Sequence, residues 1–212
     1  ITLKIFRQIM MFFEYFEPIE TPKLIGFKKI FNHFVDLLNK QKFPKVLLIS
    51  GEKGIGKFTF ISHFMHYYFD QQNYDHNKNE IIKKSTFYDQ FKQKIFPNII
   101  YLKGSNFQNL KVENIRRLKD DLRKTSINND KRFIILDDVE VFNLNSLNAL
   151  LKLIEEPSNM NHFILINNKS KPIIETINSR CIEIKVILDI KTKENILSFL
   201  IDFFKQEMLL DK

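Results

Sequence analysis

The glycines of this chain are concentrated in one place, and that place constrains the fold more than any other feature. Only five glycines occur in 212 residues, and Gly51, Gly54 and Gly56 all fall within the run GEKGIGKFT. An apolar run at 45–50 precedes this stretch and a helical pattern at 58–69 follows it. A glycine-rich turn between a strand and a helix N-terminus points backbone amides inward as a cradle for phosphate oxygens. We therefore predict that these glycines and Lys57 bind nucleotide phosphates, with ATP as the ligand.

The residue after Lys57 departs from the usual form of such a loop. That position normally holds Ser or Thr, whose hydroxyl binds Mg²⁺, and here it is Phe58. Thr59 carries a hydroxyl and remains a nucleotide-binding candidate, but one residue further along a helix is a turn of about 100°. We expect the loop to keep its shape and to admit ATP, with impaired Mg²⁺ binding and little or no hydrolysis.

Apolar runs and helical patterns alternate along the chain. Buried strands are expected at 45–50, 98–102, 133–136, 163–166 and 181–186. Helices are expected at 58–69, 113–124, 146–156 and 191–210. Residues 70–97 look like a surface insertion with one helix. Strands that alternate with helices predict an α/β fold with a parallel sheet.

Two acidic residues stand at the end of the third apolar run. Asp137 and Asp138 close the segment FIILDD. In nucleotide-binding proteins with this loop, an acid at that strand end orients the Mg²⁺ shell, and the next acid orients the attacking water. We predict that both line the nucleotide site, although the side chain of Asp138 is one methylene shorter than that of Glu.

Two downstream segments resemble a known family. The stretch NSLNALLKLIEEP at 145–157 is similar to a signature of clamp-loader AAA+ subunits, and FILINNKSKPIIETINSRC at 163–181 is similar to their next segment. The resemblance covers roughly residues 24–186. It implies a P-loop AAA+ fold, with the five strands of the parallel sheet in the order 5-1-4-3-2 and flanking helices, followed by a small helical lid.

The resemblance also implies roles for single residues. Arg180, in the Ser-Arg-Cys motif, would act in trans as an arginine finger on a neighbouring subunit's nucleotide. Asn168 would be the polar sensor at the end of the fourth strand, with Asn167 as the alternative. Phe58 favours the delta-prime kind of subunit over the ATP-hydrolysing gamma/tau kind. A second observation is weaker: residues 70–97 lack the cysteines of the zinc module found in gamma/tau subunits.

The resemblance also predicts how the chain is divided into domains and which proteins it binds. We expect an N-terminal extension at 1–23, the AAA+ domain at 24–187 and the start of the lid at 188–212, with no C-terminal oligomerisation domain. The implied partners are gamma/tau and delta subunits in a hetero-oligomer of DNA polymerase III, and, through the complex, the sliding clamp and primer-template DNA. An active gamma/tau-type ATPase and a DNA-binding AAA+ protein such as an initiator are the alternatives.

Composition excludes several other classes. The net charge is +8, but the lysines are spread along the chain and are expected to be solvated. One cysteine excludes a disulfide framework and a Cys-rich zinc site, and favours the cytoplasm. No segment reaches the roughly 18 apolar residues that span a membrane. We expect no zinc, and we expect His63, His66 and His76 to be solvated on the surface.

Overall fold

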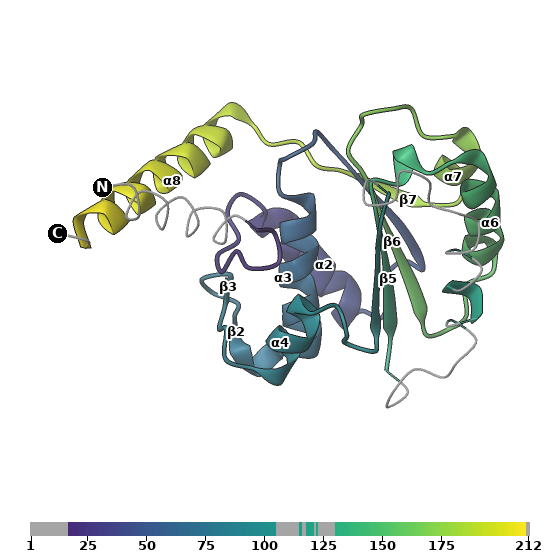
Figure 1. Ribbon diagram of the computed structural model, residues 1–212, viewed down its shortest axis with the longest axis horizontal. Helices are drawn as coiled ribbons and strands as arrows, with labels where there is room; N and C mark the ends of the chain where they lie inside the picture. The colour runs from purple at the N-terminus through teal and green to yellow at the C-terminus, as the bar shows by residue number, and fades with distance from the viewer. Residues whose placement is uncertain (1–16, 105–114, 116–117, 121, 123–129, 211–212) are drawn as a thin grey trace.

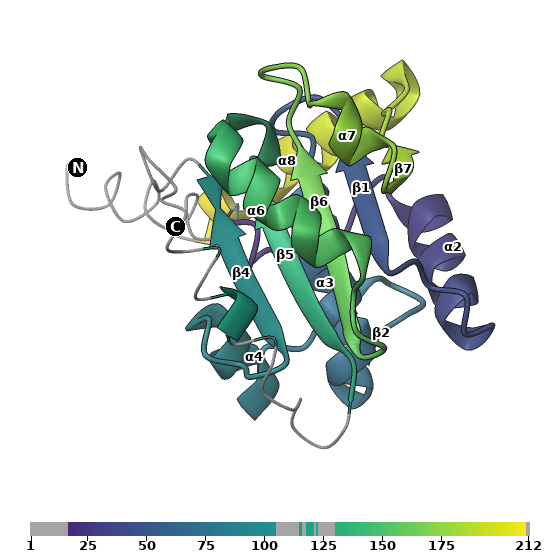
Figure 2. The same ribbon diagram turned by 90° about the vertical axis from the view of Figure 1, so that its right-hand side faces the viewer.

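Five parallel strands form the central sheet of the protein, which is described by a computed structural model over residues 17–104, 115, 118–120, 122 and 130–210. The strands are β1 (Val46–Ser50), β4 (Ile99–Lys103), β5 (Arg132–Asp137), β6 (Asn161–Asn167) and β7 (Ile182–Lys185). Across the sheet they lie in the order β7-β1-β6-β5-β4 (Figure 2). Numbered by their appearance among these five, the order is 5-1-4-3-2, and the predicted fold class is confirmed.

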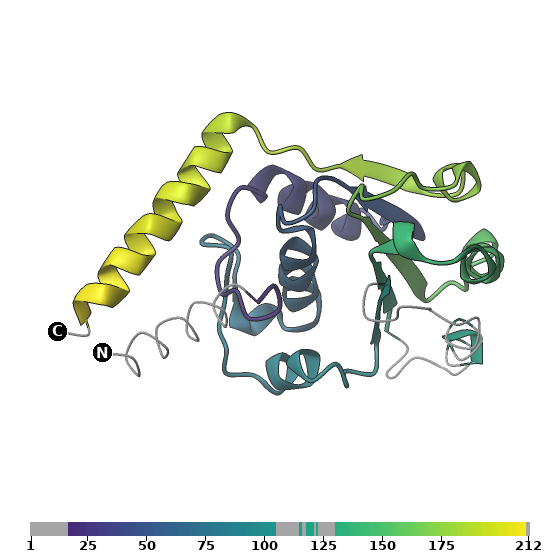
Figure 3. The same ribbon diagram turned by 45° about the horizontal axis from the view of Figure 1, so that its top comes forward.

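Helices cover both faces of this sheet (Figure 1). One face carries α2 (Lys28–Asn39), α3 (Lys57–Phe69) and α4 (Thr86–Lys92), and the other carries α6 (Leu144–Glu155) and α7 (Glu175–Asn178). The last helix, α8 (Ile190–Leu210), extends away from these layers (Figure 3). The predicted helices at 58–69, 146–156 and 191–210 are therefore present, with starts one or two residues earlier than expected. Asn143 explains the earlier start of α6, because its side chain accepts a hydrogen bond from the Ser146 amide at 2.9 Å as an N-cap.

Burial of the strands follows their position in the sheet. β1, β5 and β6 are buried along their whole length, as continuous apolar runs predict. The expectation of burial is wrong for most of β4, which is half-buried, and for β7, which is largely exposed. Both are edge strands with one neighbour only, and apolar composition alone does not reveal which strand is at an edge.

Phenylalanine fills the layer between the sheet and α2–α3. Phe34 is fully buried and its ring lies 4.8 Å from that of Phe60 and 5.2 Å from that of Phe64, both edge to face. Phe43 and Phe133 continue the same cluster to the sheet. Helix α2 was not predicted, although Phe27, Phe31, Phe34 and Val35 recur at helical spacing and are all buried.

Residues 70–97 contribute to the core as well as to the surface. The segment contains a 3-10 turn (Gln71–Asn73), a hairpin of β2 (Tyr74–Asp75) and β3 (Glu80–Ile81), and α4. The predicted single α-helix is α4, and the hairpin was missed because its strands are only two residues long. Much of the predicted helix at 113–124, and the N-terminal extension up to residue 16, lie outside the described residues.

The expectation that the histidines are solvated is right for His76, which is exposed, and wrong for His63 and His66. Both lie on α3, which the hairpin, α4 and the sheet surround. His63 contacts the Tyr74 hydroxyl at 3.2 Å and the Thr21 carbonyl at 3.1 Å. The nitrogens of His66 have no hydrogen-bond partner among the described residues, and its ring packs edge to face on Phe87 at 4.9 Å. Burial lowers the pKa of His66 to about 4 and that of His63 to about 3.

These low pKa values predict that the protein loses stability in mild acid. Each imidazole takes up its proton more readily in the unfolded chain, so the contribution of these two groups to stability is constant above about pH 6.5 and falls as the pH drops toward 4. One proton taken up on unfolding costs about 1.4 kcal/mol per pH unit in that window. Urea unfolding at pH 7, 6 and 5 measures the slope, which His66→Leu should reduce by about one proton. His33 is exposed on α2, and His33→Leu is the control for the substitution of a histidine by leucine as such.

Candidate nucleotide-binding site

The loop between β1 and α3 has the backbone shape that its glycines predict. Gly54 and Gly56 have φ angles of +86° and +91°, which side chains other than glycine rarely adopt. Gly51 meets a different constraint, because a Cβ atom there would lie 2.7 Å from the Val186 carbonyl oxygen. The first glycine therefore permits the close approach of the chain just after β7, and the other two permit the turn into α3.

Lys57 is buried and folds back onto its own loop. Its Nζ donates hydrogen bonds to the carbonyl oxygens of Gly51 at 2.8 Å and Glu52 at 2.6 Å. Burial lowers the pKa of its ammonium, while the nearby carboxylates of Asp137 and Glu140 oppose that shift. The ammonium group of Lys57 therefore lies within the loop between β1 and α3, hydrogen-bonded to two of its carbonyl oxygens.

The two aspartates at the end of β5 are buried and tightly hydrogen-bonded. Asp137 Oδ1 accepts from the Asp138 amide at 2.9 Å, and Asp137 Oδ2 accepts from the Tyr101 hydroxyl at 3.1 Å. Burial, and then the charge of Asp138, raise the pKa of Asp137. Asp138 has a left-handed backbone with φ of 55°, which costs an L-residue about 1–2 kcal/mol and is typical of functional sites.

Asn168, one residue after β6, joins this acidic pair. Its Nδ2 donates to Asp138 Oδ1 at 2.6 Å and lies 3.3 Å from Asp137 Oδ1. The side chain of Asn167 instead accepts from the Lys169 amide at 2.8 Å. Of the two sensor candidates, Asn168 is the one that the fold brings to the aspartates.

Two residues of this cluster were missed by sequence reasoning. Buried Glu140 accepts from the Asn168 amide at 3.1 Å and from the Ser170 hydroxyl at 2.8 Å, so it fixes the loop after β6. Its place three residues after Asp137 was the available signal. Tyr101 lies on a different strand, and only the pairing of β4 with β5 brings it to Asp137, so no local pattern could have revealed it.

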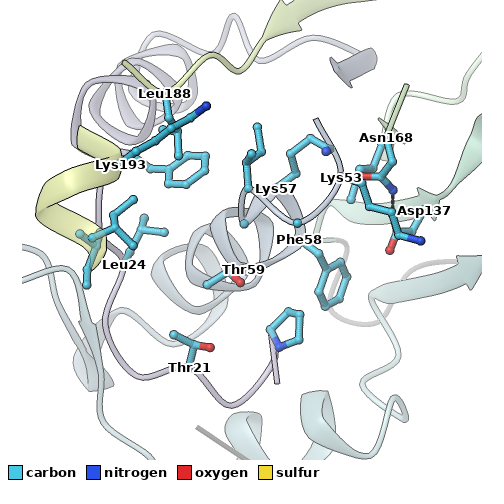
Figure 4. A pocket seen from close by; sticks show the side chains of 18 of the residues that line it. Thr21, Leu24, Lys53, Lys57, Phe58, Thr59, Asp137, Asn168, Leu188 and Lys193 are labelled. Carbon is cyan, nitrogen blue, oxygen red and sulfur yellow. Dashed lines mark hydrogen bonds between the residues drawn. The ribbon is translucent and has the colours of Figure 1, made fainter. Parts of the chain in front are cut away.

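A cavity of about 760 Å³ opens beside the loop (Figure 4), a size typical of small-molecule sites. At one end its lining is polar, from Lys53, Gly54, Lys57, Lys103, Asp137, Asp138 and Asn168. Apolar residues also line it, among them Leu24 and Leu188, which Figure 4 shows on the side away from Asp137, together with Lys193. Such a cavity can hold a phosphate chain at one end and a flat apolar ring system at the other.

Phe58 and Thr59 both line this cavity, in different directions. Figure 4 shows the Phe58 ring directed toward the side of Asp137, with Thr59 on another side of the helix. The Phe58 ring centroid lies 4.7 Å from that of Tyr101. The position that usually offers Mg²⁺ a hydroxyl therefore offers a phenyl ring, and the strand-end carboxylate is already hydrogen-bonded on both oxygens. This donor set does not match the one that holds Mg²⁺ in P-loop proteins.

Arg180 lies outside this cavity. Its guanidinium binds Glu155 through Nη2 at 2.7 Å and Nε at 3.0 Å, and Nη1 donates to the Thr176 carbonyl at 2.9 Å. Its side chain remains 36% exposed, so it is accessible from solvent. None of these partners lines the cavity beside the chain's own loop.

Other site types find little support in the described part of the chain. No group of three or more His, Cys, Asp or Glu side chains there could hold a metal ion, and the absence of zinc stays a prediction. No described helix is long and apolar enough to cross a membrane. Cys181 is half-buried against α6 and α7, and burial raises the pKa of its thiol to about 11, as suits a packing residue.

Several known proteins similar to this chain are subunits of DNA polymerase III. Subunit gamma of Buchnera aphidicola subsp. Schizaphis graminum is 28% identical over 190 residues, which are 89% of this chain and 50% of that protein. Subunit delta' of Pseudomonas aeruginosa is 32% identical over 74 residues, which are 35% of this chain and 23% of that protein. A gamma subunit-related protein of Thermotoga maritima superposes with a TM-score of 0.46 at 15% identity, over 76% of this chain and 48% of that one. The chain spans about half the length of the gamma relative.

A sequence model of one family matches the chain over residues 26–189. That range includes the glycine-rich loop between β1 and α3, the acidic end of β5, Asn168 and the Ser-Arg-Cys motif. The match covers well over half of the chain, which therefore belongs to the family described as DNA polymerase III, delta subunit.

Proposed function

We propose that this protein is a clamp-loader subunit of the delta-prime kind, which supplies Arg180 to a neighbouring ATPase subunit and hydrolyses little or no ATP itself. The observation that carries the proposal is the place of Arg180, outside its own cavity and accessible from solvent. An arginine in that position cannot serve the chain's own phosphates, but it can enter the site of a neighbour.

A finger of this kind acts on the charge that develops in the transition state. The planar guanidinium donates several hydrogen bonds to the transferring phosphoryl group, and such fingers raise turnover by about 10³–10⁵-fold. In the isolated chain, Nε and Nη2 of this guanidinium donate to the Glu155 carboxylate instead. Exchange of one exposed carboxylate for a phosphate costs little, since exposed ion pairs contribute about 0–1 kcal/mol.

The proposal assigns the chain's own cavity to ATP. Gly51, Gly54 and Gly56 shape the cradle, and Lys57 contacts the phosphates. Asp137, Asp138 and Asn168 lie at the phosphate end, and Thr59 at the start of α3. Residues 24–187 would form the AAA+ domain, and α8 would begin the lid that closes over the cavity.

The proposed partners follow from the family. The protein would assemble with gamma/tau-type and delta-type subunits in the cytoplasm and, through the complex, act on the sliding clamp and primer-template DNA. The test is to replace Arg180 by Ala in the assembled complex and to measure ATP turnover at the partner site.

An active gamma/tau-type ATPase is the second candidate. One finding favours it: the gamma relative from Buchnera matches 89% of this chain, whereas the delta' relative matches 35%. Phe58 favours the first candidate, because it replaces the hydroxyl that usually binds Mg²⁺, and Tyr101 donates a hydrogen bond to the nearby Asp137 carboxylate.

Hydrolysis distinguishes the two candidates. With Mg²⁺ present, the purified chain should release phosphate from ATP no faster than its Lys57→Ala variant. Phe58→Thr alone should leave turnover low, because Tyr101 still donates a hydrogen bond to Asp137 and no neighbouring subunit supplies an arginine. Steady-state phosphate release is the measurement. A turnover near the 1–10³ s⁻¹ typical of enzymes, lost in Lys57→Ala, would establish the gamma/tau-type alternative.

A further inference from the structure

The cavity offers a divalent cation no hydroxyl at residue 58, yet a nucleoside triphosphate brings about four negative charges to it. In proteins with this loop, Mg²⁺ lies between the phosphates and the acid at the strand end and neutralises both. Here Phe58 supplies no oxygen, and both oxygens of Asp137 accept hydrogen bonds from Tyr101 and from the Asp138 amide. Some other positive charge has to separate the phosphates from the aspartates.

Lysine side chains are the available source of that charge. The cavity is lined by five lysines and two aspartates, with no Arg or Glu among its lining residues. The lining is therefore positive without any bound metal. Lys53, Lys57 and Lys103 contribute at the polar end, where Asp137 and Asn168 lie.

Among these lysines, Lys103 is the one placed beside the strand-end carboxylate that usually faces a metal ion. It is the last residue of β4 and pairs in register with Asp137 at the end of β5. Burial raises the pKa of that carboxylate, and the charge of Lys103 offsets part of this effect. It also lines a second, adjoining cavity together with Phe58, Tyr101 and Asp137. Lys103 thus lies beside the carboxylate of Asp137 and the two aromatic residues, Phe58 and Tyr101, that alter its surroundings.

We propose that this cavity binds nucleoside triphosphates without a divalent cation, and that Lys103 supplies the charge that Mg²⁺ supplies elsewhere. The inference rests on the proposed nucleotide site and specifies the ionic form of its ligand. An ammonium can neutralise phosphates but cannot organise an in-line attack through ordered ligands, so the same arrangement that permits binding disfavours hydrolysis.

The experiment compares ATP binding by calorimetry in excess EDTA and in excess MgCl₂. For the unaltered protein the two dissociation constants should agree within about twofold. Lys103→Met should weaken binding in EDTA by about tenfold or more, a change of about 1.4 kcal/mol or more. The matched control is Lys185→Met, which also removes a lysine from the last position of an edge strand, but at the opposite edge and outside the cavity. It should bind within about twofold of the unaltered protein.

A double variant tests whether Phe58 and Tyr101 are the reason that ATP binding does not depend on Mg²⁺. Phe58→Thr with Tyr101→Phe returns a hydroxyl to the first turn of α3 and releases one oxygen of Asp137. This protein should bind ATP about tenfold more tightly with Mg²⁺ than with EDTA. Melting temperatures of all variants verify that each one is folded.

Several outcomes of these experiments would overturn the proposal of metal-free binding. Tenfold or stronger tightening by Mg²⁺ in the unaltered protein would overturn it, as would Lys103→Met binding normally or a double variant indifferent to Mg²⁺. Failure to bind ATP under either condition would overturn it too, while the trans role of Arg180, read out at the partner site, would stand or fall separately.

Discussion

Arg180→Ala is expected to lower ATP turnover at the adjacent partner site by about 10³-fold or more in a complex rebuilt from the full-length protein and its ATPase subunits. The guanidinium stabilises charge that exists only in the transition state, so its loss affects rate more than assembly. The melting temperature of the variant should be nearly unchanged, because the exposed pair with Glu155 contributes about 0–1 kcal/mol. Clamp loading on primed DNA should slow in parallel.

Two further variants make this expectation specific. Arg180→Lys should restore little, since an ammonium lacks the planar fork of donors. Glu155→Ala removes the same ion pair and keeps the arginine, so turnover should remain close to that of the unaltered complex. If the Arg180→Ala complex assembles normally and hydrolyses ATP at full rate, Arg180 is a surface residue and the proposed function is wrong.

Phe34→Ala is expected to destabilise the protein by about 3–5 kcal/mol, a large part of the total stability of a typical domain. Phe34 is fully buried between α2 and α3, with the rings of Phe43, Phe60 and Phe64 within 5.5 Å of its own centroid. Truncation leaves a cavity that these stiff rings cannot collapse to fill. Urea unfolding at pH 7 measures the loss.

The neighbouring residue on the same helix provides the control. His33 is exposed, and His33→Ala should change the unfolding free energy by no more than about 0.5 kcal/mol. Phe34→Leu, which keeps most of the volume, should lose less than Phe34→Ala. A loss below about 1 kcal/mol for Phe34→Ala would show that the aromatic layer is loosely packed and that stability depends on other parts of the fold.

Features that depend on local sequence were predicted well. The loop, its flanking strand and helix, and α6 follow from glycine placement and apolar periodicity within a dozen residues. The strand order required the family resemblance, because periodicity cannot tell which strands are neighbours. That limit also explains why burial was wrongly predicted for β4 and β7, whose apolar sequences do not differ from those of central strands.

Two other features were missed or wrongly predicted because they depend on contacts between segments that are distant in sequence. Tyr101 and Asp137 are 36 residues apart in sequence and meet only through the pairing of β4 with β5. His63 and His66 appeared solvated because the residues that bury them, such as Tyr74 and Phe87, belong to a segment read as a surface insertion. Phe58 can be read directly from the sequence, and the weak Mg²⁺ binding that it implies stays a prediction, whereas the contact of Tyr101 with Asp137 depends on tertiary structure.

The two hydrogen bonds of Lys57 have a consequence for how readily the cavity fills. An ammonium that already has carbonyl acceptors at 2.8 Å and 2.6 Å is satisfied before any ligand arrives, so the protein's own backbone competes with the phosphate for it. Binding then replaces one set of hydrogen bonds by another, and the net gain is smaller than the new contacts alone suggest. The same two bonds hold the loop in shape, so under the proposed function a nucleotide would have to displace them before Lys57 could contact its phosphates.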